Sequence, residues 1–210
     1  MKLYFTKTPR IFTRIFSNYT WRFSSDKKEI YLTFDDGPTP EITDFVLSEL
    51  QKHNAKATFF CIGKNVEKHP DIFKRLITEG HAIGNHTHNH FNGWKHKTTD
   101  YLDNILTCED VISKSIKSKL FRPPYGKIKT SQGKELIKKG YKIIMWSVLS
   151  ADFDTSISRE QCLQNVLRNT NNGSIVVFHD SLKASEKLTY VLPKVLEEFS
   201  KKGFTFKAIT

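Results

Sequence analysis

The sequence predicts a single-domain α/β protein built on parallel strands, and two observations indicate this. Short apolar runs alternate with segments of helical periodicity along nearly all of the 210 residues. Such regular alternation is typical of parallel strands joined by crossover helices. There is also no repeat, low-complexity tract or linker, so the length suits one domain. The pattern alone does not separate an open doubly wound sheet from an incomplete barrel.

Seven short apolar runs are predicted as strands, because each is short and bounded by polar or turn-forming residues. In chain order they are Glu29–Phe34, Ala57–Ile62, His81–Asn85, Leu120–Arg122, Tyr141–Val148, Ser174–Phe178 and Phe204–Ile209.

Helices are predicted in the intervals between these strands. Glu41–His53 follows Pro40, a residue that favours helix starts. Asn65–Glu79 and Ser131–Lys139 are each followed by a glycine, which suits the end of a helix. The others are Thr98–Lys117, Ser158–Asn169 and Glu186–Lys201.

Residues 1–29 are predicted to form a basic and aromatic extension packed on a domain of residues 30–210. A helical turn in it would gather one apolar face, flanked by Arg10 and Arg14 and made of Ile11, Phe12, Ile15 and Phe16. Such a face either lies on a membrane surface or packs against its own domain, and we expect the second.

The composition excludes several classes of protein. The formal charge of +11 indicates attraction to anionic surfaces, but the lysines are spread along the whole chain, which favours simple solubility. We expect no nucleic-acid partner, because there is no Arg-rich run and no RNA-binding or helix-turn-helix signature. Three distant cysteines without a CxxC pair do not form a disulfide scaffold. No apolar stretch is long enough to span a bilayer.

The first ten residues carry charges where a signal peptide has its hydrophobic region. On sequence alone we therefore expect a cytoplasmic monomer, with export by another route or association with a surface left open.

Polar side chains gather just past the ends of five predicted strands, where a buried core is not expected to place them. In parallel α/β folds these ends line one rim, and the active site lies there. The sequence therefore predicts a catalytic site made from Asp35-Asp36, His86 to His90, Arg122 to Gly126, Asp152, and His179-Asp180.

His86 and His90 are four residues apart, so one helical turn would project both to the same side. Two imidazoles and one carboxylate, from Asp35 or Asp36, form a common three-ligand zinc set with a position left open. The other aspartate would face the bound water as a general base, since successive side chains leaving a strand point in different directions. His88 should point away. The ligand set also tolerates cobalt or nickel.

Five segments occur in an order that resembles the motifs of the polysaccharide deacetylase family, the carbohydrate esterases with the NodB homology domain. They are Thr33 to Pro38 (TFDDGP), His86 to His90, Arg122 to Gly126 (RPPYG), Trp146 to Asp152, and Val177 to His179. The resemblance runs from about Ile30 to the end of the chain. It implies a distorted, incomplete (β/α) barrel of about seven parallel strands.

The resemblance also implies a role for each residue. Asp35 would be the general base, Arg122 would orient it, and His179 would be the general acid with Asp152 as its partner. One divalent ion, zinc by preference, would be held by Asp36, His86 and His90. The Tyr125 N–H would stabilise the oxyanion. The implied substrate contacts are Val177, Tyr125, Pro124 and Phe153.

Two residues depart from the family pattern. Leu149 stands where an aspartate is common, and Phe153 stands where a tryptophan is usual. These departures affect the wall of the substrate groove more than the chemistry.

The sequence thus predicts a metal-dependent hydrolase that removes N-acetyl groups from an aminosugar-containing glycan, such as peptidoglycan or a chitin-like oligosaccharide. A metal-dependent phosphoesterase or nuclease is an alternative, but it would usually need ligands for two ions. A non-catalytic glycan-binding protein is another, but it would be expected to have lost the base or the acid.

Overall fold

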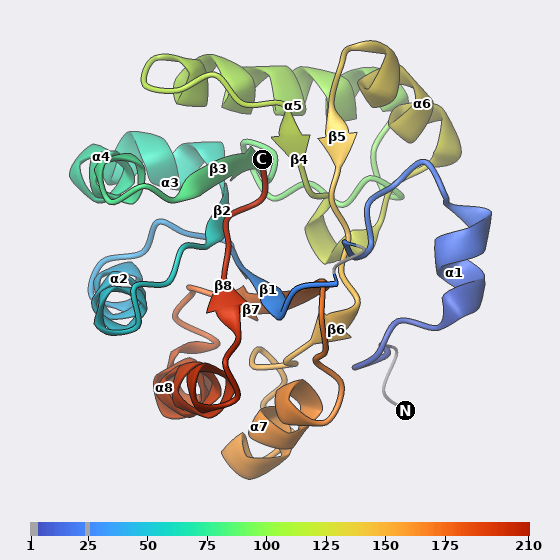
Figure 1. The fold of residues 1–210 in the computed structure, drawn as a ribbon. Coiled ribbons are helices and arrows are strands. Elements are labelled where there is room, and N and C mark those ends of the chain that lie inside the picture. The colour runs from blue at the N-terminus through green and yellow to red at the C-terminus, as the bar shows by residue number, and fades with distance from the viewer. Residues whose placement is uncertain (1–3, 24–25) are drawn as a thin grey trace.

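A computed structural model describes residues 4–23 and 26–210 of the chain. Among these residues, eight strands form one curled sheet in the order β5-β4-β3-β2-β1-β7-β6, and β8 pairs with the start of β1. Every pairing between these strands is parallel. The helices surround the sheet on its outer side (Figure 1). This architecture confirms the predicted incomplete barrel of parallel strands.

The strands are short apart from β1 and β7, which are neighbours in the sheet. They are β1 Glu29–Asp35, β2 Thr58–Cys61, β3 Ala82–Asn85, β4 Leu120–Phe121, β5 Lys142–Ile143, β6 Val148–Leu149, β7 Ser174–His179 and β8 Thr205–Phe206. The α-helices are α1 Arg10–Ile15, α2 Ile42–Lys52, α3 Gly63–Lys68, α4 Pro70–Thr78, α5 Thr98–Ser113, α6 Thr130–Lys138, α7 Arg159–Leu167 and α8 Ser185–Lys201, with one 3₁₀ turn at Pro124–Gly126.

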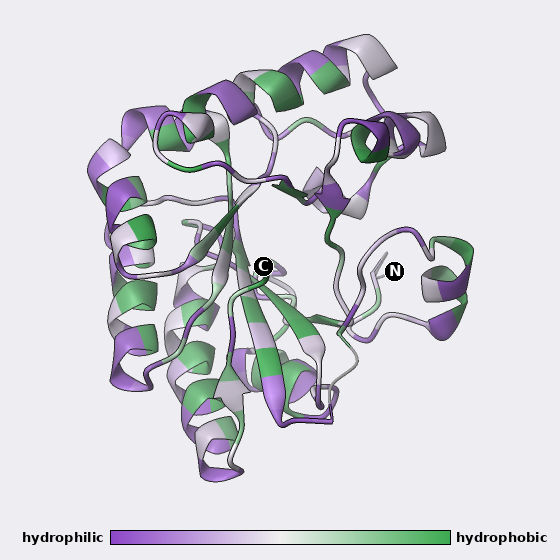
Figure 2. Cartoon of the chain, turned by 45° about the horizontal axis from the view of Figure 1, so that its top comes forward, coloured by the Kyte–Doolittle hydropathy of each residue, from purple (hydrophilic) through white to green (hydrophobic). Residues whose placement is uncertain are grey.

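Side chains alternate across β1, and this alternation separates the core from the site. Ile30, Leu32 and Phe34 point outward into the main apolar cluster beneath the helices. The faces of these helices that meet the sheet are apolar and their outer faces are polar (Figure 2). Thr33 and Asp35 point to the other side, which is the inside of the half-barrel, where they meet Arg122.

The prediction of one strand over Tyr141–Val148 is wrong, because the segment forms β5 and β6 with a break between them. The carbonyl oxygens of Ile144 and Met145 accept hydrogen bonds from the Arg122 guanidinium, at 3.1 and 2.9 Å, instead of pairing along a strand.

The prediction of one helix over Asn65–Glu79 is also wrong. α3 ends at Lys68 and α4 begins at Pro70, since proline lacks the N–H that would continue the first helix.

The N-terminal segment lies along the open side of the half-barrel, between β5 and β6 (Figure 1). Isolated bridges join Lys7 to Val148 and Thr20 to Ile144. The expectation that the apolar face of this segment packs on the domain is wrong for α1, which has no buried residue. Ile11 and Ile15 are 56% and 63% exposed. No helix among the described residues is long and apolar enough to cross a membrane.

Candidate active site

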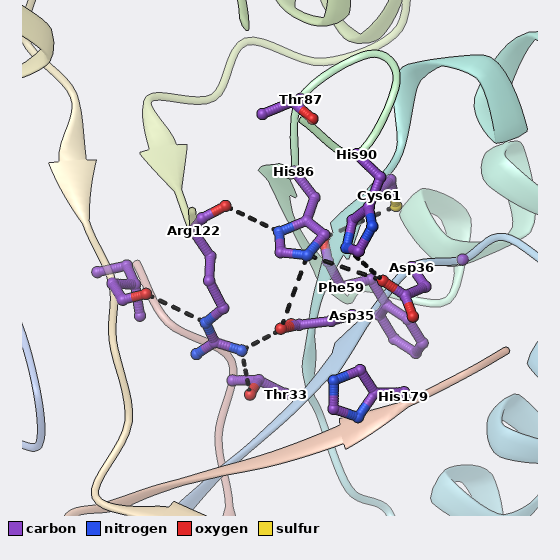
Figure 3. A network of polar contacts seen from close by, with 12 residues as sticks. Thr33, Asp35, Asp36, Phe59, Cys61, His86, Thr87, His90, Arg122 and His179 are labelled. Carbon is purple, nitrogen blue, oxygen red and sulfur yellow. Dashed lines mark hydrogen bonds and ion pairs between the residues drawn. The ribbon is translucent and has the colours of Figure 1, made fainter. Parts of the chain in front are cut away.

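The carboxyl end of β1 sends two neighbouring aspartates in different directions. Asp35 is still in the strand and pairs in register with His179 of β7 and Phe60 of β2. Asp36 has left the sheet with a positive φ of 85°, so its carboxylate turns toward the loop after β3. One aspartate therefore faces the interior of the half-barrel and the other faces the two histidines (Figure 3).

Asp36, His86 and His90 each offer a ligand atom, and these atoms all lie within 4.8 Å of one another. The Oδ1 atom of Asp36 is 3.3 Å from Nε2 of His90 and 3.8 Å from Nε2 of His86. The two histidines do not share a helical turn as the sequence predicted, since residues 86–90 form a loop. Positive φ angles at Thr87 and His90 fold this loop so that both rings face Asp36.

Two asparagines hold the histidine loop from behind, and sequence reasoning missed both. Oδ1 of Asn104, in α5, accepts hydrogen bonds from the backbone N–H groups of His88 and Asn89 at 3.0 Å each. Oδ1 of Asn85 accepts the N–H of Thr87 at 2.8 Å. Asn104 is a polar residue on the buried face of an amphipathic helix. A polar residue at such a position indicates a buried hydrogen bond, and this feature of the sequence could have identified it.

The donor set suits a divalent ion, and the structure gives two independent observations for this. Oδ1 of Asp36 is buried and has no hydrogen-bond partner among the described residues. Nδ1 of His86 lies 2.8 Å from the Arg122 carbonyl, so a proton there donates to the carbonyl and leaves Nε2 free as a ligand.

Burial keeps both histidines neutral, as metal ligands must be. It lowers the pKa of His86 to about 3, with the nearby His90 adding to the effect. Burial also lowers the pKa of His90, although Asp36 and Asp35 act in the opposite direction.

His88 points away from this cluster, as predicted. Its Nε2 atom lies 3.7 Å from Glu67, on the outer side of the loop.

Asp35 is held by Arg122, which is fully buried. Nη1 of Arg122 donates to Oδ1 of Asp35 and to Oγ1 of Thr33, both at 2.7 Å. The other guanidinium donors bind backbone carbonyls, and the planar group lies 4.1 Å from the centre of the Phe60 ring. These contacts fix the orientation of the guanidinium. Arg122 therefore holds the Asp35 carboxylate in place and compensates its negative charge.

His179, at the end of β7, and Asp152, in the turn after β6, form a second pair. Asp152 is fully buried and accepts two hydrogen bonds at 2.8 Å, from Nδ1 and from the backbone N–H of His179. Burial alone would lower the pKa of His179, but the charge and hydrogen bond of Asp152, together with the charges of Asp36 and Asp35, raise the pKa to about 9. The ring is therefore protonated at neutral pH.

Several of the candidate catalytic and metal-binding side chains line one cavity of about 440 Å³. The metal cluster, Asp35 and His179 share it with Val177, Tyr125 and Phe153 from the predicted substrate contacts. Pro124 is buried and does not line the cavity, whereas Pro123 does. Trp146, the first residue of the fourth motif, also lines the cavity. Further lining residues that no motif indicated are Tyr4, Ser181 and the two lysines Lys127 and Lys183.

Asp180 lies behind the site rather than in it. Its carboxylate accepts the Gly37 N–H at 3.0 Å and the Thr43 hydroxyl at 2.6 Å. A Cβ on Gly37 would come within 1.9 Å of Oδ2 of Asp180, so only glycine fits this turn. Burial raises the pKa of Asp180 to about 7, and both hydrogen bonds act against the rise.

The chain is similar in sequence to known proteins along most of its length. A family model described as polysaccharide deacetylase matches residues 23–144. A peptidoglycan-N-acetylglucosamine deacetylase of Bacillus cereus is 38% identical over 196 residues, which are 90% of this chain and 70% of that protein. A chitooligosaccharide deacetylase of Azorhizobium caulinodans is 34% identical over 168 residues, with 79% and 80% covered.

The fold is similar to that of solved structures. A crystal structure of a peptidoglycan N-acetylglucosamine deacetylase, bound to an N-hydroxybenzamide that carries a naphthalene ring, superposes with a TM-score of 0.88. The two sequences are 35% identical, and the match covers 96% of this chain and 95% of the other.

Proposed function

Because the chain belongs to the polysaccharide deacetylase family, we propose that it hydrolyses N-acetyl groups of an aminosugar-containing glycan by a metal-dependent acid–base mechanism. Membership confirms the predicted enzyme class, a deacetylase. The observation that carries the mechanism is the single cavity shared by Asp35, His179 and the cluster of Asp36, His86 and His90. Peptidoglycan and chitin-like oligosaccharides are the proposed substrates, since similar proteins are named for them.

Asp36, His86 and His90 would hold one divalent ion, for which we propose zinc, with cobalt or nickel as substitutes. When bound, the ion would polarise the acetyl carbonyl and lower the pKa of a water molecule toward neutrality. The lone Oδ1 of Asp36 and the free Nε2 of His86 are the observations that support this assignment.

Asp35 is the proposed general base. Arg122 leaves Oδ2 of Asp35 free on the side of the histidines, where it lies 4.0 Å from Nε2 of His86. A water molecule attacking from that side would give up its proton to Asp35. Removal of the base should lower kcat by roughly 10²–10⁴-fold.

His179 is the proposed general acid. With Nδ1 committed to Asp152, Nε2 is the atom that can deliver a proton to the departing amine. The Tyr125 N–H is proposed to stabilise the oxyanion, a contribution typically of about 3–4 kcal/mol. Val177 and Phe153 are proposed to flank the acetyl group, because both line the cavity, whereas the burial of Pro124 makes its substrate contact indirect. Residues 30–210 would carry all of this chemistry, with residues 1–29 as an extension.

The test is acetate release from acetylated peptidoglycan fragments and chitooligosaccharides, with added zinc and with a chelator. We expect zinc-dependent release with one ion per chain. His90→Ala should lose both zinc binding and turnover. Asp35→Asn should keep zinc binding but lose turnover, which separates the base from the ligands.

Unchanged acetate release by Asp35→Asn would rule out the assignment of the base. Two ions per chain together with phosphate release would instead indicate a phosphoesterase.

A further inference from the structure

A second cavity adjoins the catalytic cavity on the side of the N-terminal segment. Its volume is about 320 Å³. We call it the aromatic groove and define it by Phe5, Phe12, Phe16, Trp94, Trp146 and Leu149. Trp146, Leu149, Tyr4 and Tyr125 line both cavities, so a ligand in the catalytic cavity can extend into the groove.

Three polar groups of the groove walls are already bound to backbone carbonyls. The indole N–H of Trp94 donates to Ile128 at 3.2 Å, and that of Trp21 donates to Phe16 at 3.0 Å. The Thr8 hydroxyl donates to Trp146 at 2.8 Å. What remains toward the groove is mostly ring faces and aliphatic groups, and the Tyr125 hydroxyl and the Lys127 ammonium belong to the part that also lines the catalytic cavity. A row of sugar rings would find few hydrogen-bond partners there, whereas an apolar chain would need none.

One of the two departures from the family pattern makes the groove more apolar. Leu149 stands in both cavities at the position where an aspartate is common in the family. Phe5 and Trp94 also line the groove, and they are 59% and 60% exposed. Large apolar side chains gathered and exposed around one groove are typical of a binding site.

The outer face of the N-terminal segment is suited to contact with a lipid membrane, where lipid-linked molecules are anchored. Ile11 and Ile15 of α1 point away from the groove and are exposed, next to Arg10 and Arg14. No acidic residue occurs before Asp26. Apolar side chains flanked by basic ones favour contact with an anionic lipid surface.

We propose that the aromatic groove binds an apolar chain attached to the acetylated sugar, so that the substrate is a lipid-linked N-acetyl aminosugar. This inference rests on the proposed function, because the acetyl group must lie in the catalytic cavity while the chain leaves along the groove.

The experiment compares the methyl, butyl and octyl glycosides of N-acetylglucosamine as substrates of the zinc-loaded enzyme. We expect kcat/KM to rise with chain length, by up to about fourfold for each methylene that becomes fully buried. Phe12→Ser and Phe5→Ser should reduce the octyl-to-methyl ratio, and both side chains are exposed enough for the fold to tolerate the change. Ile137→Ser, an exposed apolar residue outside the groove, is the matched control and should keep the ratio.

Binding is measured separately from turnover in the Asp36→Ala variant. The octyl glycoside should displace the apolar dye N-phenyl-1-naphthylamine from this variant, and the methyl glycoside should not. Phe12→Ser should weaken the displacement.

Equal kcat/KM for the methyl and octyl glycosides, together with no displacement of the dye, would overturn the inference and leave the deacetylase standing. Dye displacement without acetate release from any glycoside would count against the proposed function alone. If Phe12→Ser impaired the N-acetylglucosamine trimer and not the octyl glycoside, the groove would be a sugar site.

Discussion

At the scale of single residues, the pair of His179 and Asp152 sets the pH range of the proposed reaction. Two hydrogen bonds from His179 to one buried carboxylate fix both the orientation and the tautomer of the ring. Burial disfavours the protonated ring, and Asp152 more than offsets this, so the pKa rises to about 9. A general acid must be protonated to act, so activity should be lost as the pH rises through this value.

Asp152→Asn should therefore move the alkaline limb of the kcat/KM profile to lower pH. Without the carboxylate charge, burial acts with less opposition, the pKa of His179 falls, and the protonated form disappears sooner. The profile should be measured for the zinc-saturated wild type and variant side by side, so that the electrostatic effect of the ion on His179 is the same in both. An alkaline limb at the same pH in the variant would show that another group is the acid.

At the scale of elements, α5 supports the proposed metal site. Within the part of the chain that the structure describes, Asn104 is the residue of α5 that accepts hydrogen bonds from the backbone N–H groups of His88 and Asn89. The His88 N–H also donates to the backbone carbonyl of Asn104 at 3.1 Å, so the Asn89 N–H is the group that depends on Oδ1 alone. A hydrogen bond of this kind typically contributes about 0.5–1.5 kcal/mol. Groups that orient metal ligands typically change metal affinity by about 10–100-fold when they are removed.

Asn104→Leu keeps the branching of the side chain at Cγ and removes its Oδ1 acceptor, while the backbone carbonyl stays available to the His88 N–H. We expect a loss of zinc affinity of roughly 10–100-fold, measured by competition with a chelator of known affinity. Thr107→Ala is the control on the same helix, since its hydroxyl is exposed and binds only the Asp103 carbonyl. Wild-type zinc affinity in Asn104→Leu would mean that the loop keeps its shape without α5.

At the scale of the whole molecule, the sequence predicted the parallel sheet and the rim of polar residues at its carboxyl end. It did so because periodicity and strand-end position are local features. Three features escaped prediction because they depend on distant contacts. Arg122 removes two carbonyls from the strand over Tyr141–Val148, positive φ angles shape the loop of His86 and His90, and α1 leaves its apolar face exposed. None of these three features is indicated by the amino-acid pattern of the segment in which it occurs.

The proposed metal site also joins parts of the sheet that do not pair directly. Asp36 follows β1, His86 and His90 follow β3, and β2 lies between these strands. An ion that binds only the folded chain stabilises it by mass action, by about 4 kcal/mol at a concentration 1,000 times its Kd. For a domain of this size, that corresponds to a rise in Tm of roughly 8–16 °C.

Zinc should therefore raise the Tm of the wild type, followed by circular dichroism, and should leave that of His90→Ala nearly unchanged. His90 is partly exposed, so alanine there opens no cavity in the core. The variant retains every other histidine and cysteine, so it also reports any stabilisation by ions bound elsewhere. The same rise in both proteins would place the stabilising ion away from Asp36, His86 and His90, and would remove the cluster as the metal centre.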